Sequence, residues 1–118
     1  MMPMPMLEVP RPRLPRAGHH QEYRAQQVLG ASPTQLLLML YEIAIVGCEA
    51  RDAQRARGAL TELIGGLNFD AGDVAVGLFR LYEYCLWEIR RDRFPAAGGV
   101  LRSLKRAWEE ALAGRAAG

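Results

Sequence analysis

The fold of this chain is decided by residues 32–49, which read SPTQLLLMLYEIAIVGCE. Ser32 is a favourable helix N-cap, and Pro33 suits the first helical turn, where its missing N–H leaves no hydrogen bond unmade. Only three polar side chains share one line along this helix, and they are Gln35, Glu42 and Glu49. A helix that is apolar on nearly every other side is either buried centrally or keeps one side for a partner. A membrane span is not indicated, because that needs roughly 20 apolar residues and Glu42 interrupts this run.

Length and charge limit the classes of function. The 118 residues are enough for one domain. Residues 1–31 carry four basic and two acidic side chains, whereas residues 32–118 carry eleven of each. The positive excess therefore belongs to the N-terminal segment. A neutral folded part is a poor electrostatic footprint for nucleic acid, and we expect no nucleic-acid partner.

The first 22 residues are rich in proline. The prolines are Pro3, Pro5, Pro10, Pro12 and Pro15. This density excludes regular helix and sheet and predicts a disordered tail, although a proline-rich ligand for a groove-binding module is an alternative. His19 and His20 are interpreted as a solvated pair, because a metal site would need further ligands at suitable spacing. No continuous apolar stretch of a signal peptide is visible here.

Residues 23–31 precede the central helix and form a candidate flap. Tyr23, Val28 and Leu29 are apolar enough to pack on a helical bundle. The flap would end at Gly30–Pro33, because the residue before a proline avoids the α-helical region. The expected organisation is a disordered tail over 1–22 and a helical domain over 23–118.

Three further helices are expected, over about 52–67, 73–92 and 95–113. Each carries one apolar stripe at helical spacing. The stripes are Ala56, Leu60, Leu63 and Leu67; Val74, Leu78, Leu81, Cys85 and Ile89; and Ala97, Leu101, Leu104, Trp108 and Ala111. No strand pattern of useful length occurs. The sequence therefore predicts an all-α fold, an antiparallel four-helix bundle with a short N-terminal flap.

Trp87 departs from the pattern of the third helix. It falls on the same side as Arg80, Glu83 and Arg90, which should face water. One interpretation is an indole covered by the stems of neighbouring arginines. The other is an exposed aromatic anchor for a partner.

The residues of the folded part do not indicate an enzyme. Both histidines lie in the tail, so no catalytic triad and no Cys/His zinc spacing is possible in the helices. We expect no catalytic residues, no metal and no cofactor. Cys48 and Cys85 are interpreted as buried hydrophobic residues of a reducing cytosol, with a disulfide between them as an alternative. The expected function is binding.

Four stretches in order resemble the flagellar secretion chaperones, a family of flagellin export chaperones. The resemblance is carried by Ser32-Pro33-Thr34-Gln35-Leu36 with Leu38-Met39-Leu40-Tyr41-Glu42, by Leu67-Asn68 with Gly72-Asp73-Val74-Ala75, by Leu78, Leu81, Tyr82 and Tyr84, and by Leu104 with Trp108. Tyr23 resembles the tyrosine that precedes the first helix in that family. The likeness spans residues 23–112.

The resemblance implies a cytoplasmic chaperone that binds the disordered C-terminal segment of flagellin. It would prevent premature polymerisation and deliver flagellin to the gate of the flagellar type III export apparatus. An amphipathic segment would fold on apolar grooves of the bundle as it binds. The flap would cover part of the groove when flagellin is absent. Neither membrane insertion nor a particular oligomer is implied, and both monomer and homodimer stay open.

Eight residues are the candidate partner-binding set. They are Tyr23, Val28 and Leu29 of the flap, Leu38, Tyr41 and Ile45 of the first helix, and Tyr82 and Trp87 of the third. For Leu38, Ile45 and Tyr82 a place in the core is the competing interpretation. The alternative function is a helical-bundle adaptor that binds a different amphipathic protein segment.

Overall fold

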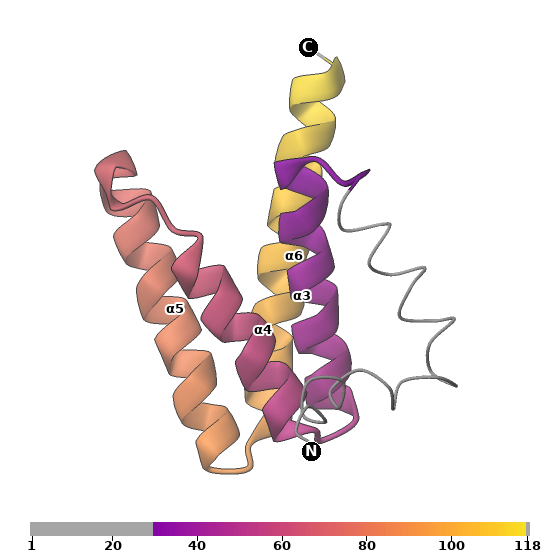
Figure 1. Cartoon of the computed structure of the whole chain (residues 1–118), viewed down its shortest axis with the longest axis vertical. Coiled ribbons are helices and arrows are strands. Elements are labelled where there is room, and N and C mark those ends of the chain that lie inside the picture. Colours follow the sequence, from indigo (N-terminus) through magenta and orange to yellow (C-terminus); the bar gives the residue numbers. More distant parts are fainter. Residues whose placement is uncertain (1–29, 118) are drawn as a thin grey trace, which may run out of the picture. The chain divides into compact units, whose positions relative to one another are not determined.

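The computed structural model describes residues 30–117, which hold four α-helices, one short 3-10 helix and no strand. The elements are α3 (Pro33–Glu49), α4 (Ala53–Gly65), η1 (Phe69–Ala71), α5 (Asp73–Arg90) and α6 (Phe94–Ala117). Consecutive helices run in opposite directions, as Figure 1 shows. The predicted all-α four-helix bundle is therefore confirmed. The expected tail and the flap residues Tyr23, Val28 and Leu29 lie outside the described residues.

Local signals place the beginnings of the helices. Helix α3 begins at Pro33, as the Ser-Pro pair predicts. Asp52 is the N-cap of α4, and its carboxylate accepts a hydrogen bond from the backbone N–H of Arg55 at 3.1 Å. Helix α5 begins at Asp73, whose carboxylate favours the positive end of the helix dipole.

Helices α3 and α5 end in the same tight turn without glycine. Arg51 has a φ of 55°, in the left-handed region. Its N–H donates to the Cys48 carbonyl at 3.1 Å, and the next N–H, that of Asp52, donates to the Gly47 carbonyl at 2.8 Å. This is a Schellman motif, and the same pair of hydrogen bonds recurs at the end of α5 around Asp92, with a φ of 62°. These turns reverse the chain within three residues.

The core draws on all four α-helices. Its buried members are Tyr41, Ala44, Ile45, Cys48, Ala56, Ala59, Leu60, Leu63, Tyr82, Cys85, Ile89, Phe94, Ala97 and Leu101. The stripe predicted for the second helix is confirmed, since Ala56, Leu60 and Leu63 are buried. The C-terminal part of the fourth stripe is wrong, because Ala111 is exposed while Leu112 is half-buried.

The buried face of α5 differs from the predicted stripe. Val74 and Leu81 were expected in the core, yet they are 66% and 39% exposed. Ala75 and Tyr82 are buried in their place. The face of α5 that packs inward carries Tyr82, whose hydroxyl meets that of Tyr41 on α3, and Val74 and Leu81 lie to one side of this face.

Helices α3 and α4 touch backbone to backbone at Gly47. A methyl group placed on Gly47 would lie 2.8 Å from the backbone nitrogen of Ala56 and 3.1 Å from its Cα and Cβ atoms. Only glycine fits at this distance without a shift of α4. The short turn between the two helices therefore depends on two small residues that face each other.

Candidate partner-binding site

The first two turns of α3 are the least covered part of that helix. The five consecutive apolar residues 36–40 are all half-buried, whereas the following turns hold the buried residues Tyr41, Ala44, Ile45 and Cys48. Figure 1 shows the physical reason: α4 and α5 lean away from α3 and α6 toward the end at which α3 begins. Here α3 lacks the neighbours that cover its second half.

The outer face of α3 keeps apolar surface on both sides of its polar line. Leu38, Met39 and Val46 border this line, and all three are half-buried. Ile45 was expected to share this surface, but it is only 5% exposed and belongs to the core. We call Leu38, Met39 and Val46 the α3 strip. It is the candidate surface for an amphipathic segment.

The polar line of α3 pairs with α6. The Lys105 ammonium lies 3.3 Å from the Glu42 carboxylate and 3.3 Å from that of Glu109. The Arg102 guanidinium lies 3.2 Å from Glu49. The hydrogen bond to Glu42 raises the pKa of Lys105, opposed by a smaller desolvation effect. These contacts hold α6 along one edge of the polar line of α3.

Three aromatic residues from three helices meet at the core of the bundle. Trp108 donates from Nε1 to the hydroxyl oxygen of Tyr41 at 3.0 Å, and the Tyr41 and Tyr82 hydroxyls share a short hydrogen bond. Both tyrosines are buried, at 0% and 1% exposure. Burial raises the pKa of both hydroxyls, so both stay protonated at neutral pH. We call this set the Tyr–Tyr–Trp cluster; it joins α3, α5 and α6.

The candidate residues do not form a single surface. Tyr41, Ile45 and Tyr82 are core residues in this structure, so a partner would have no exposed part of them to contact. For Ile45 and Tyr82 this is the competing interpretation stated above. Leu38 is half-buried on α3, and Trp87 is 46% exposed on α5. Partner binding by Leu38 and Trp87 stays a prediction.

Trp87 is covered by an arginine on one face and is also partly exposed. The Arg91 guanidinium lies over its ring, 4.5 Å from the centroid, so an arginine does cover one face. Nearly half of the residue nevertheless faces solvent. Trp87 and Tyr82 project from different sides of α5, so Trp87 is separate from the Tyr–Tyr–Trp cluster.

The sequence also predicts that Met39 and Val46 border the polar line as uncovered surface for a partner, although they are not among the eight candidates, and both are half-buried. The sequence analysis did not identify Gly47, which lies against Ala56 where α3 and α4 approach most closely. The available signal was a glycine on the core side of a helix that is followed by an alanine-rich helix. A glycine at a helix crossing has this use because it lets two backbones approach.

Both cysteines of the described residues carry free thiols. Cys48 and Cys85 are free and buried, and burial raises both thiol pKa values, that of Cys85 to about 12. At neutral pH these thiols are therefore protonated. Within residues 30–117, no three His, Cys, Asp or Glu side chains gather as a metal ion would require. In the same part of the chain, no helix has the length and apolar character to cross a bilayer.

The chain was also compared with known proteins. No protein family, no curated protein and no solved structure matches it.

Proposed function

We propose that this protein is an export chaperone for flagellin. It would bind the disordered C-terminal segment of flagellin in the cytosol, prevent premature polymerisation and deliver the subunit to the flagellar type III export apparatus. The basis is the ordered resemblance of four stretches to the flagellar secretion chaperones.

One observation carries the proposal. The Tyr–Tyr–Trp cluster joins three of the stretches that make up the resemblance: Tyr41 comes from the first, Tyr82 from the third and Trp108 from the fourth. Residues up to 67 positions apart in the chain thus meet in one hydrogen-bonded group. Motif residues that converge in this way support a shared architecture more strongly than four separate likenesses do.

The α3 strip suits an amphipathic guest. A segment that is disordered alone gains stability when its apolar side chains are removed from water, by roughly 1.5–3 kcal/mol for each fully buried Leu or Val. The strip offers Leu38, Met39 and Val46 for this purpose. The acidic line beside it, Glu42 and Glu49, already pairs with α6, which leaves hydrophobic contact as the main attraction.

The test is a binding titration with flagellin and with flagellin that lacks its last ~40 residues, about the length that a helical guest would need to follow this bundle. Full-length flagellin should bind and the truncated form should not. Equal binding of the two would refute the proposal. Binding of neither, with binding of another amphipathic export substrate, would favour the adaptor function instead.

A pair of variants would locate the surface. Leu38→Gln with Val46→Gln should weaken flagellin binding at least about tenfold, because both side chains would leave the apolar contact. Val76→Gln on α5 is the matched control, since it removes an exposed valine elsewhere. Equal losses in the two proteins would place the site away from α3.

A further inference from the structure

The proposed function leaves one exposed surface of α5 without a role. Two aromatic residues lie there one turn apart, Tyr84 at 40% and Trp87 at 46% exposure. Arg80, Glu83 and Arg90 of the same helix and Arg91, the residue that caps its C-terminus, surround them. We call these six residues the α5 ridge. Large exposed aromatic side chains that serve neither core nor cluster are typical of a contact surface.

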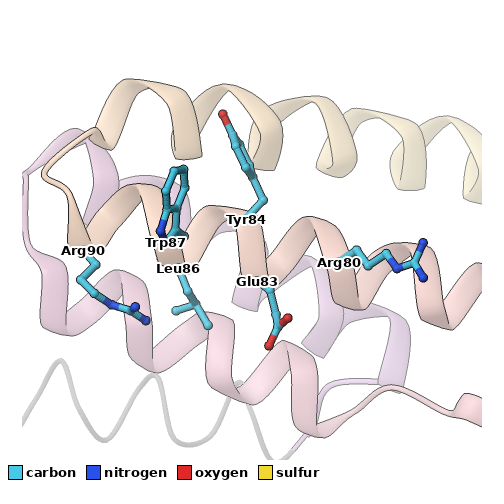
Figure 2. A pocket seen from close by; sticks show the side chains of 6 residues that line it. All are labelled: Arg80, Glu83, Tyr84, Leu86, Trp87 and Arg90. Carbon is cyan, nitrogen blue, oxygen red and sulfur yellow. The ribbon is translucent and has the colours of Figure 1, made fainter.

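The α5 ridge also lines a hollow in the surface. Arg80, Glu83, Tyr84, Trp87 and Arg90, together with Leu86, line a shallow hollow of about 410 Å³. Figure 2 shows the two aromatic rings standing close together on one flank of α5, with Glu83, Leu86 and Arg90 on the other. The Arg91 guanidinium lies over one face of the indole, 4.5 Å from the ring centroid, and leaves the rest of the ring open to a partner.

The charges of the ridge are unbalanced. Arg80, Arg90 and Arg91 carry three positive charges against the single carboxylate of Glu83. Elsewhere in residues 30–117, Arg93 and Arg102 are paired with carboxylates, but no ion pair joins a ridge arginine to any of the described acids. Three cations beside exposed aromatic rings complement a partner that carries both carboxylates and an apolar group.

We propose that the α5 ridge docks an acidic segment of another protein. An apolar side chain of that segment lies against Tyr84 and Trp87. Its carboxylates pair with Arg80 at one end and with Arg90 and Arg91 at the other. The two ends are ten residues apart on α5, which corresponds to about 15 Å along the axis. The partner therefore presents its carboxylates about 15 Å apart, on either side of an apolar anchor.

Charge argues against two other occupants. A second copy of the chain would bring the same three arginines against themselves, and like charges in a contact are unfavourable. A nucleic acid would meet the Glu83 carboxylate in the lining of the hollow, and residues 32–118 have no net charge to attract a phosphate backbone. An acidic protein segment satisfies the ridge without either conflict.

This inference does not rest on flagellin binding. The ridge uses no residue of the α3 strip or of the Tyr–Tyr–Trp cluster. The Arg80→Glu, Arg90→Glu protein, which leaves all eight partner-binding candidates in place, can therefore be tested against both partners. It should bind flagellin as the unmodified chain does, and its loss of flagellin binding would overturn the separation of the two surfaces.

The probes are two synthetic helical peptides of about 18 residues, long enough at ~27 Å to span the ridge. Both carry one leucine stripe; the first has glutamate on its flanks and the second has lysine. Titration calorimetry on the full chain should show binding of the glutamate peptide and at least about tenfold weaker binding of the lysine peptide. Equal affinities, or no binding of the glutamate peptide, would overturn the proposal.

Variants then place the peptide. Trp87→Ala should weaken the glutamate peptide at least about tenfold, and Arg80→Glu with Arg90→Glu should reverse the preference toward the lysine peptide. Arg57→Glu on α4 is the control, since it reverses another exposed arginine. An unchanged affinity in Trp87→Ala would overturn the assignment to the ridge.

The competing occupants give different results. If the unmodified chain forms a dimer in sedimentation experiments and Trp87→Ala dissociates it, the ridge is a contact between copies, and the proposal is wrong. Tighter binding of a single-stranded oligonucleotide than of the glutamate peptide would likewise replace the protein partner by nucleic acid.

Discussion

The two halves of α3 have the same apolar character and different surroundings. Residues 36–40 are half-buried throughout, whereas Tyr41–Cys48 holds five buried residues. The difference comes from α4 and α5, which meet α3 at its C-terminal half and lean away from its N-terminal half (Figure 1). Helix α3 thus divides into a C-terminal half that builds the core, which we call the closed half, and an N-terminal half that stays available to a partner, which we call the open half. Apolar composition alone does not distinguish these two uses.

The largest expected effect on stability comes from truncating Leu60 in the closed half, and the same change at Leu38 in the open half is the comparison. Leu60 is fully buried in α4 against the closed half, and Leu60→Ala should lower the free energy of unfolding by about 3–4 kcal/mol, through lost contacts and a cavity. Leu38→Ala in the open half should cost about 1 kcal/mol, because a half-exposed side chain loses less contact. Chemical denaturation measures both. Equal losses would show that the first turns of α3 are core.

The second prediction concerns the close contact between α3 and α4 at Gly47, in the closed half. Gly47→Ala should destabilise the protein by about 2–3 kcal/mol, because the new methyl group would meet the backbone of Ala56 at 2.8 Å. Gly58 is the matched control, since it lies inside α4 with open space around its Cα. Gly58→Ala should stabilise the protein by up to about 1 kcal/mol. A thermal melt in which both alanines stabilise would contradict the close approach of α3 and α4.

Helix existence and helix starts could be predicted from the sequence because local chemistry decides them. The Ser-Pro pair before α3, the Asp52 cap of α4 and the Asp73 start of α5 act within one turn of the chain. The helix ends at Arg51 and Asp92 follow no glycine signal, so only the structure shows that these residues adopt the left-handed conformation.

The site was less predictable because it depends on contacts that are distant in sequence. Tyr82 lies outside the predicted stripe, since nothing local indicates that its hydroxyl meets that of Tyr41, 41 residues earlier. With Tyr82 facing α3, Leu81 lies outward at 39% exposure, and Tyr41 and Tyr82 are buried in the core instead of on a binding surface. Trp87 could be recognised as unusual from the sequence alone, because it shares one face of its own helix with arginines that should face water.

The closed half should also make stability sensitive to alkaline pH. Cys85 is fully buried there, and burial raises its pKa from 9.0 to about 12. A raised pKa stabilises the fold fully below pH 9, and this contribution is lost as pH rises from 9 toward 12. The loss should reach about 1.4 kcal/mol by pH 10, one unit above the unfolded value.

Cys85→Ala isolates this contribution. The variant lacks the thiol, so its free energy of unfolding should change less between pH 8 and pH 10 than that of the unmodified chain. Tyr41 and Tyr82 retain their own raised pKa values in both proteins, which makes the comparison internal. Parallel pH dependences in urea titrations would show that Cys85 does not sense the core as its burial implies.

The smallest expected effect lies in the tight turns that end α3 and α5. Asp92 adopts a φ of 62°, which costs a residue with a Cβ atom roughly 1 kcal/mol relative to glycine. Asp92→Gly should therefore stabilise the chain by up to about 1 kcal/mol, less the entropy that glycine adds to the unfolded state.

Arg51→Gly tests the equivalent turn after α3, but there the guanidinium also lies 5.0 Å from the centre of the Phe94 ring. Because glycine would remove that contact, Arg51→Gly should gain less than Asp92→Gly in the same thermal melt. An equal gain in the two variants would show that the arginine contributes to the closed half through its backbone alone.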